Sequence, residues 1–245
     1  MRLGFMQPYF VPYPGYFALI ERSDTWLVFD DAQMIRHGWV NRNRVLHATE
    51  PWQYIRVPVV GHAREALIRD IEVADLGWGK KLVGQLAPYR RAPHRDAVIG
   101  LIEGVAALGH TRLLDVNLAL LAAVCAHVGV RFAPRLHSEL AYDRARVQGP
   151  GDWALEAGRA LCATSYVNPP GGRELFDAAR FQEAGMSLEF LTWETPPYPQ
   201  GTRPFEPHLS IVDMLMYVAP DEVLARLRAA RCEPAAAGPR VLDGV

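Results

Sequence analysis

The sequence predicts an α/β protein that opens with a βαβ unit, continues as a parallel or mixed sheet and carries an inserted helical region. Short apolar runs typical of buried strands alternate along the chain with longer stretches of helical spacing. The first run, a turn, a short helix and a second run fit within about 30 residues, the size of a βαβ unit. Further along the chain, apolar residues recur at every third or fourth position, which indicates the helical insertion.

The N-terminal unit is predicted from its turns and its apolar runs. A buried strand at 2–6 leads into an aromatic segment at 7–16, where three prolines and a glycine exclude a continuous helix. Helical spacing resumes at 16–20, and a second strand at 26–29 ends in the pair Asp30-Asp31. Ligands of open α/β sheets bind beyond the carboxyl ends of the strands, so this pair marks a candidate site.

The later elements follow from the same two periodicities. Strands are expected at 44–46, 52–59, 130–133, 165–168 and 187–193, and helices at 77–87, 94–108, 112–127, 152–163, 174–184, 210–219 and 220–231. Residues 1–232 are expected to form one catalytic domain, within which about 90–163 make a mainly helical lobe. Residues 233–245 are rich in Ala, Pro and Gly and are expected to be a flexible tail.

Composition excludes several classes of protein. Half of the 245 residues are hydrophobic and 22% are charged, which allows a sizeable core and excludes wholesale disorder. The formal net charge of −1 provides no global basic field for nucleic acid or an anionic membrane. No apolar run reaches the roughly 18 residues of a membrane span, and the N-terminal residues do not open a signal peptide. We therefore expect a cytoplasmic protein with neither nucleic acid nor membrane as partner.

Asparagine is scarce, which makes each of its positions informative. The only asparagines are Asn41, Asn43, Asn117 and Asn168, and only two of the 26 basic residues are lysine. This composition indicates a coding bias toward Arg and Ala. A position that keeps asparagine in such a chain is expected to need that side chain.

The opening unit resembles that of the nucleotidyltransferase and pantothenate-synthetase-like group, a Rossmann-like arrangement in which H-x-G-H follows the first strand. Here the motif is Tyr13-Pro14-Gly15-Tyr16. Loss of both histidines removes the imidazoles that would stabilise a transferring phosphate, which argues against adenylyl transfer. The candidates for substrate binding in this unit are Gln7, Tyr9, Tyr13 and Tyr16. The alternative is that the tyrosines only pack on a proline-rich loop.

A second group of candidates begins where the second strand ends. Paired carboxylates there can bind a cation, an amine or a hydroxyl-rich substrate. Asn41 and Asn43 face one side of an extended segment, and Arg42 or Arg44 supplies a fork for carboxylate or phosphate. The alternative is a hydrogen-bonded turn with aspartate caps and solvated arginines. The substrate site is predicted to include Asp30, Asp31, Gln33, Trp39, Asn41, Arg42 and Asn43.

These segments together resemble the signature of the WbqC-like family. The matching motifs are Met6-Gln7-Pro8-Tyr9-Phe10, Phe29-Asp30-Asp31-Ala32-Gln33, Gly38-Trp39-Val40-Asn41-Arg42-Asn43-Arg44, Tyr166-x-Asn168-Pro169 and Phe205-x-Pro207-His208-Leu209-Ser210. The resemblance covers about residues 3–220. It implies a place in O-antigen or specialised-metabolite pathways and the attachment of acyl or aminoacyl groups to amines.

Two later motifs complete the predicted site. The first is a strand end closed by a Gly-Gly turn, whose backbone N–H groups can cradle an anion; it contains Tyr166, Asn168 and Gly171. Alternatively, Asn168 caps the next helix.

The second motif, Ser210-x-x-Asp213, predicts a helix start that resembles a capping box. His208 is not explained by that cap. We predict it to be a general base for an amine, oriented by Asp213 or Asp30. The other histidines, His137 among them, are expected on the surface or in loops.

The leading hypothesis is an N-acyltransferase or aminoacyltransferase that moves an activated acyl group onto an amine of a small molecule or amino sugar. The predicted catalytic residues are His208, Asp30 and Asp213. The expected donor is a phosphopantetheine thioester on an acyl or peptidyl carrier protein, and no other cofactor and no metal is assigned. Direct aminolysis is preferred because Cys125 and Cys162 are predicted to be buried structural thiols. The alternatives are an ATP-dependent ligase or nucleotidyltransferase-like enzyme, and a non-catalytic module that binds a sugar or a carrier protein.

Overall fold

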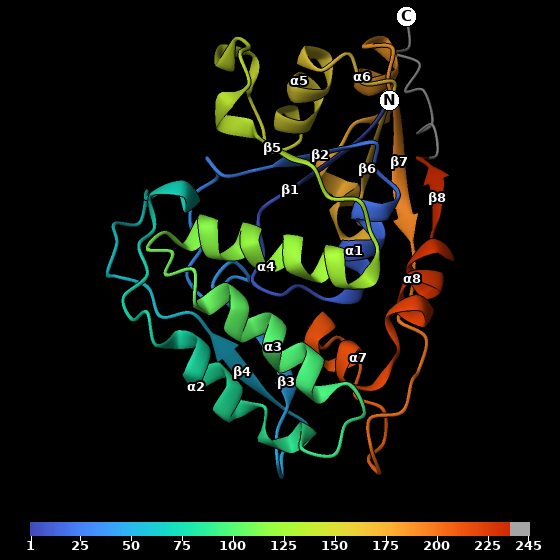
Figure 1. Cartoon of the computed structure of the whole chain (residues 1–245). Helices are drawn as coiled ribbons and strands as arrows, with labels where there is room; N and C mark the ends of the chain where they lie inside the picture. The colour runs from blue at the N-terminus through green and yellow to red at the C-terminus, as the bar shows by residue number, and fades with distance from the viewer. Residues whose placement is uncertain (236–245) are drawn as a thin grey trace, which may run out of the picture.

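A six-stranded sheet runs through the middle of the protein, in a computed structural model that describes residues 1–235 (Figure 1). Its strands are β1 (Arg2–Met6), β2 (Thr25–Val28), β5 (Pro134–Leu136), β6 (Ser165–Asn168), β7 (Ser187–Thr192) and β8 (Arg231–Pro234). Their spatial order is β5-β2-β1-β6-β7-β8. All neighbouring pairs are parallel except β7 and β8, which are antiparallel. The predicted α/β class is confirmed, and of the predicted parallel or mixed sheet the structure has the mixed form, with mostly parallel pairs.

Helices cover both faces of this sheet (Figure 1). One layer contains α1 (Pro14–Glu21), α2 (Trp78–Gln85), α3 (Arg95–Ala106), α4 (Leu113–Val128), α7 (Ile211–Tyr217) and α8 (Pro220–Arg228), and the other contains α5 (Asp152–Ala160) and α6 (Ala178–Glu183). Five 3-10 turns join them: η1 (Ile68–Asp70), η2 (Ala87–Tyr89), η3 (His137–Glu139), η4 (Arg144–Arg146) and η5 (Pro170–Leu175). A separate antiparallel hairpin, β3 (Arg42–Leu46) with β4 (Trp52–Arg56), belongs to the larger layer.

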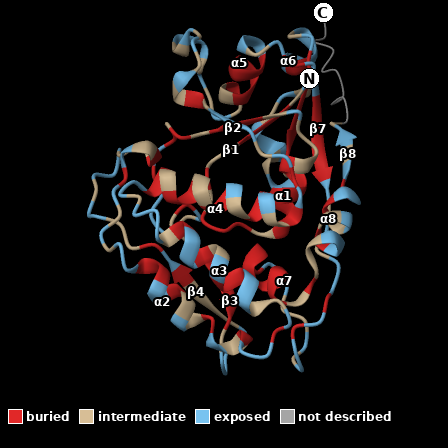
Figure 2. Ribbon diagram, viewed as in Figure 1, coloured by how far each residue is buried: buried red, intermediate tan, exposed pale blue. Residues whose placement is uncertain are grey.

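The strands divide the apolar core between the two layers. Because side chains alternate along a strand, Phe5 and Leu27 face α5 and α6, whereas Trp26 and Val28 face the larger layer. Figure 2 shows buried residues in red on the strands and on parts of the helices that pack in the interior. Apolar burial on both faces favours a parallel sheet, since each of its strands is covered on both sides.

The order of the strands reverses at β1, and that reversal positions the candidate site. From β1 the chain proceeds to β2 and β5 on one side, and later to β6 and β7 on the other. A sheet of this kind has its ligand crevice at the carboxyl ends of the strands next to the reversal. The residues that follow these ends are Gln7 after β1, Phe29 and Asp30 after β2, His137 after β5 and Pro169 after β6.

Several predicted boundaries need correction. The predicted strand at 130–133 lies at 134–136, where it pairs with β2, and residues 233–234 of the predicted flexible tail belong to β8. The strand β8 was not predicted, since its charged and proline residues have no strand pattern. The main helical insertion is 78–128 rather than 90–163, because β5 returns to the sheet between α4 and α5.

Residues 236–245 of the predicted tail lie outside the described residues. None of the helices within residues 1–235 is long and apolar enough to cross a membrane.

Candidate functional site

The loop between β1 and α1 is held by donors from distant parts of the chain. Its prolines have no N–H to contribute to bonding, and its carbonyl groups are buried and need partners. Five donors bond to these carbonyl oxygens. They are Tyr16 Oη to Gln7 O at 2.7 Å, Asn117 Nδ2 to Pro8 O at 2.8 Å, Asn43 Nδ2 to Phe10 O at 3.0 Å, Ser210 Oγ to Val11 O at 2.6 Å and Ile211 N to Pro12 O at 2.8 Å. The scarce asparagines Asn43 and Asn117 therefore brace this loop, and α7 closes over it.

This bracing maintains a strained backbone. Val11 has φ 34°, in the left-handed region that a β-branched residue rarely adopts. Such conformations persist only where the surroundings over-determine them. Tyr9 and Tyr13, both half-buried, lie on this braced loop beyond the carboxyl end of β1. Burial and the nearby Tyr9 raise the pKa of Tyr13 to about 12, so its hydroxyl stays protonated at neutral pH.

The densest polar cluster at the sheet edge joins the ends of β2 and β5. Nδ1 of His137 forms a short contact with Oδ1 of Asp31. Nε2 of His137 lies 2.7 Å from the hydroxyl of Tyr142. Next to this pair, Asp30 accepts hydrogen bonds from Ser138, through the backbone N–H at 3.0 Å and the hydroxyl at 2.6 Å. Both aspartates therefore engage the segment that follows β5, but only Asp31 contacts a titratable base.

Arg144 completes this cluster from η4. Its Nη1 lies 3.3 Å from Oδ2 of Asp31, and 3.2 and 3.0 Å from the two ring nitrogens of His137. Nearly equal distances to both nitrogens place the guanidinium over the face of the imidazole rather than at its edge. Rings of Phe5, Phe29 and Trp153 surround the histidine at 5.0, 5.1 and 5.5 Å between ring centroids.

Electrostatics distinguish Asp31 from an ordinary surface carboxylate. Burial would raise its pKa, but the hydrogen bond and charge of His137 and the charge of Arg144 outweigh burial and hold the pKa below the usual value. His137 itself has no exposed surface, whereas the side chains of Asp31 and Arg144 are 14% and 35% exposed. An oriented imidazole therefore lies one side chain below the surface, reached through Tyr142 or Arg144.

The predicted catalytic grouping around His208 is wrong about its partners. Asp213 is fully buried and accepts from Tyr89 at 2.7 Å, Tyr198 at 2.6 Å and Gln200 at 2.7 Å. Asp30 contacts Ser138 instead. His208 is exposed, with φ 60°, and within residues 1–235 its imidazole contacts neither aspartate.

The predicted helix start at Ser210 is confirmed, but the predicted part of Asp213 in the cap is not. Ser210 is the cap of α7 and accepts from Val212 N at 3.2 Å. The side chain of Asp213 does not reach back to the cap, because it faces the buried hydroxyls of Tyr89 and Tyr198. Asp213 therefore links α7 to η2 and to the segment that follows β7.

Other predicted substrate residues are occupied within the fold. Tyr16 and Tyr166 are buried, and the hydroxyl of Tyr166 donates to Asn168 at 2.8 Å. Asn168 Nδ2 donates to Pro169 O at 2.9 Å, and a Cβ at Gly172 would lie 2.2 Å from that nitrogen. The turn after β6 is thus built by Asn168 and Gly172, while Gly171 faces open space.

The hairpin β3–β4 carries an aromatic and basic outer face. Register places Arg42, Arg44, Tyr54 and Arg56 on this face, and the guanidinium of Arg42 lies 4.2 Å from the ring of Tyr54. The guanidinium of Arg44 lies 5.0 Å from the ring of Trp52 and 5.4 Å from the ring of Trp39.

Three further predicted substrate residues precede the hairpin. Trp39 is 37% exposed. Asn41 donates weakly to Val57 O at 3.3 Å, and exposed Gln33 donates to Arg64 O at 2.6 Å. None of these contacts within residues 1–235 involves Asp31 or His137.

Comparisons with known proteins agree with the motifs. A sequence profile of the WbqC-like protein family matches residues 7–225. The chain belongs to the WbqC-like family. A relative from Mycobacterium tuberculosis (strain ATCC 25618 / H37Rv), named uncharacterized protein Rv1507c, is 29% identical over 227 residues, which cover 90% of this chain and 96% of the relative. No solved structure matches the chain.

The three cysteines of this WbqC-like protein differ in burial. Burial raises the pKa of Cys125 to about 12, so its thiol is a poor nucleophile. Cys162 is exposed rather than buried, which corrects that prediction, and Cys232 is half-buried in β8. Among residues 1–235 no three His, Cys, Asp or Glu side chains are grouped to hold a metal ion.

Sequence reasoning missed His137, Tyr142 and Arg144 as members of the polar cluster around Asp31. His137 was expected on the surface or in a loop, yet it is fully buried. His137 directly follows β5, whose pairing with β2 aligns Leu136 with Val28 and so brings His137 beside the residues that follow β2. Because β5 was predicted several residues too early, this signal was not visible.

Proposed function

We propose that this WbqC-like protein transfers an activated acyl or aminoacyl group onto the amine of a small molecule or amino sugar, in O-antigen or specialised-metabolite biosynthesis. The observation that carries the proposal is the pairing of Asp31 with His137 at the carboxyl edge of the sheet. A histidine oriented by a carboxylate is a common general base of acyl transfer. In this proposal His137 takes the role that the sequence suggested for His208.

The reaction uses Tyr142 as a relay, because His137 has no exposed surface. The amine gives a proton to the Tyr142 hydroxyl, which passes its own proton to Nε2 of His137, 2.7 Å away. A bond forms between the amine nitrogen and the thioester carbonyl carbon, the C–S bond breaks, and the proton returns to the departing thiolate. Burial raises the pKa of Tyr142 to about 12, so the hydroxyl begins the cycle protonated.

The charged side chains of Asp31 and Arg144 can stabilise the two charged species that form after proton transfer. The carboxylate of Asp31 accepts from Nδ1 and stabilises the imidazolium that forms after proton transfer. Arg144 is partly exposed beside Tyr142, with Nη1 3.1 Å from its hydroxyl, and supplies positive charge near the oxyanion of the tetrahedral intermediate. The Asp30–Ser138 bonds fix the segment that carries His137.

The deciding experiment omits ATP. The protein is incubated with a glycyl carrier protein and glucosamine, and mass spectrometry follows the amide product and the unloaded carrier. Formation of both supports the proposal, and a carrier that stays loaded across a panel of acyl groups and amines contradicts it. A requirement for ATP and Mg²⁺ would favour the ligase alternative. Saturable binding of carrier or sugar without product would favour the binding module.

A carrier protein as donor is supported by the outer face of β3–β4. Between residues 32 and 64 the chain has five arginines and a single acidic residue, Glu50. Within the described residues none of these arginines forms an ion pair with a carboxylate. A partner with an acidic surface would complement this face.

The donor can be tested at Arg56, which is exposed and opposes Arg42 across the hairpin. Arg56→Glu is expected to preserve the hairpin, because it replaces a like-charge pair with an opposite-charge pair. The KM for the carrier-bound donor should rise about tenfold, while the rate with an aminoacyl-pantetheine stays unchanged. Arg131→Glu, an exposed arginine outside the hairpin, is the control and should alter neither. Equal KM values for wild type and Arg56→Glu would exclude carrier docking on this face.

A further inference from the structure

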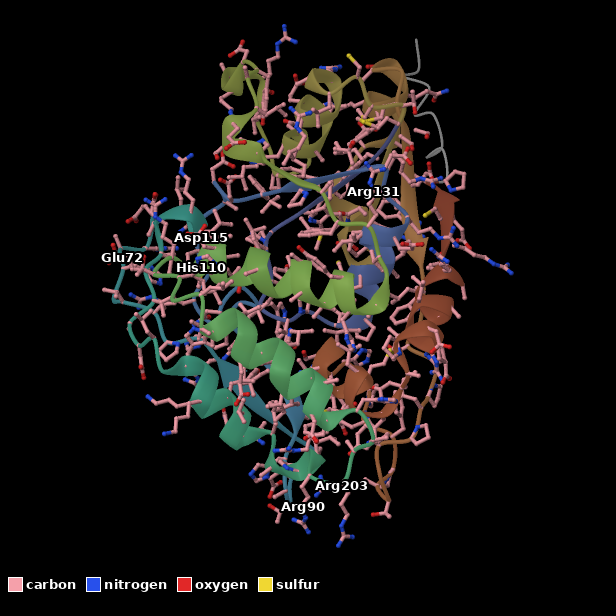
Figure 3. All side chains as sticks on the ribbon, in the orientation of Figure 1. Glu72, Arg90, His110, Asp115, Arg131 and Arg203 are labelled. Atoms are coloured by element: carbon pink, nitrogen blue, oxygen red, sulfur yellow. The ribbon has the colours of Figure 1, made fainter. Side chains whose placement is uncertain are left out.

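The lining of one cavity contains neither Asp31 nor His137, and the proposed transfer does not use this cavity. It has a volume of about 390 Å³ and opens between the end of β3, η2 and the segment 200–203. Its lining comprises Leu46, Ala48, Ala87, Pro88, Arg90, Arg91, Ala92, Gln200, Gly201, Thr202, Arg203 and Tyr217. Figure 3 shows Arg90 and Arg203 side by side at this end of the molecule, with Arg131 well away from them.

The charge of this lining is one-sided. It contains three arginines and neither aspartate nor glutamate. Arg90 and Arg91 are exposed and, within residues 1–235, have no ion pair and no side-chain hydrogen bond. Guanidinium forks that protein carboxylates leave free match the oxygens of phosphate.

The third arginine is fixed in place without being neutralised. Arg203 Nη1 donates to His47 O at 2.5 Å and to Glu50 O at 3.3 Å, and Nη2 donates to Ala48 O. All three acceptors are backbone carbonyls of the β3–β4 turn, so the side chain is ordered while its charge is retained. A fixed cation that shares a cavity with two unpaired ones is an arrangement that favours a bound anion.

The rear wall is rigid and partly polar. Gln200 is buried, donates to Asp213 at 2.7 Å and to Glu206 O at 3.0 Å, and accepts from Glu206 N at 2.6 Å. Asp213 is the nearest buried carboxylate, and its oxygens are already engaged by Tyr89, Tyr198 and Gln200. A ligand would therefore meet a preformed wall rather than a mobile loop.

From these observations we propose that the cavity binds a phosphate-bearing small molecule. Three arginines suit a doubly charged phosphate better than a singly charged carboxylate, and Thr202 and the Tyr217 hydroxyl can bond a polar body. Leu46, Ala87 and Pro88 provide the apolar surface common in ligand pockets, and the volume falls at the small end of such sites. The site is independent of the proposed acyl transfer.

Calorimetric titration with ribose 5-phosphate, ribose and acetate at constant ionic strength tests the proposal. Ribose 5-phosphate should bind saturably, and ribose and acetate at least roughly tenfold more weakly, since each lacks the charged phosphate contacts. Arg90→Gln and Arg91→Gln should each weaken ribose 5-phosphate binding about tenfold or more. Arg131→Gln lowers the net charge equally from outside the cavity and should bind as wild type does. Thermal unfolding confirms that each variant is folded.

Three results would overturn the proposal. They are an absence of saturable binding by ribose 5-phosphate, equal binding of acetate, and an equal loss in Arg131→Gln and Arg90→Gln. The last would show that affinity follows total charge rather than this cavity.

Discussion

Two buried polar clusters of this protein are built around an aspartate, yet the pKa values of the two carboxylates are shifted in opposite directions. Asp31 faces the imidazole of His137 and the charge of Arg144, and its pKa is held below the usual value despite burial. Asp213 accepts from two tyrosine hydroxyls and an amide, and burial raises its pKa although all three bonds lower it. Charged partners overcome desolvation of a carboxylate, and three neutral donors do not.

This difference separates a site suited to chemistry from one suited to structure. The Asp31 cluster lies at the carboxyl edge of the sheet with part of its surface exposed, where a substrate can reach Tyr142 and Arg144. The Asp213 cluster is closed and connects three segments, since Tyr89 Oη also accepts Leu46 N at 2.8 Å. The sequence motif containing Asp213 therefore supports the fold and the wall of the arginine-lined cavity rather than the proposed reaction.

The largest expected effect is on activity. His137→Gln removes the general base, so the transfer rate should fall about 100- to 10,000-fold in the carrier assay. Tyr142→Phe should also reduce the rate strongly, because it breaks the relay, while leaving the ring packing intact. His208→Gln is the matched control and should retain the wild-type rate. If His208→Gln lost activity and His137→Gln did not, the assignment of the two regions would be reversed.

The next largest effect is on stability, at the closed cluster. Asp213→Ala leaves Tyr89, Tyr198 and Gln200 without their acceptor, and should lower the free energy of unfolding by about 3 kcal/mol or more. Urea denaturation measures this. Glu183→Ala, at an exposed position on α6, should change it by no more than about 0.5 kcal/mol. Similar values for the two variants would mean that the Asp213 bonds contribute no net stability.

The same contrast between closed and open polar groups applies to the asparagines. Asn117 is fully buried and donates to Pro8 O at 2.8 Å and Val40 O at 2.7 Å, so Asn117→Ala should cost about 2 kcal/mol. Half-buried Asn41 has one bond of 3.3 Å, and Asn41→Ala should cost about 0.5 kcal/mol or less. Denaturation of both variants in urea provides the test. A larger loss for Asn41→Ala would contradict the bracing role given to Asn117.

The fold was more predictable from sequence than the candidate site. Apolar runs and helical spacing depend on local periodicity, so β1, β6 and most helices were placed correctly. The strand β8 was missed because only its pairing with β7 makes it a strand. Asparagine scarcity identified positions that need the side chain, but Asn43 and Asn117 are needed to brace a loop. His137 could not be found because its partner, Asp31, is brought to it only by the pairing of β2 with β5.

The smallest expected effect, and the most direct test of the comparison, is the pH dependence of stability. A lowered pKa in the folded state means that Asp31 stabilises the fold above the ordinary aspartate pKa of 3.8, and that this contribution is lost as pH falls through the folded value. The raised pKa of Asp213 has the opposite sign, favouring the fold at low pH and losing that contribution as pH rises through the folded value. Urea denaturation between about pH 3 and pH 7 should therefore show the cost of Asp31→Asn shrinking toward low pH. The cost of Asp213→Asn should shrink toward high pH. Parallel curves for the two variants would show that charged and neutral partners do not set the two carboxylates apart.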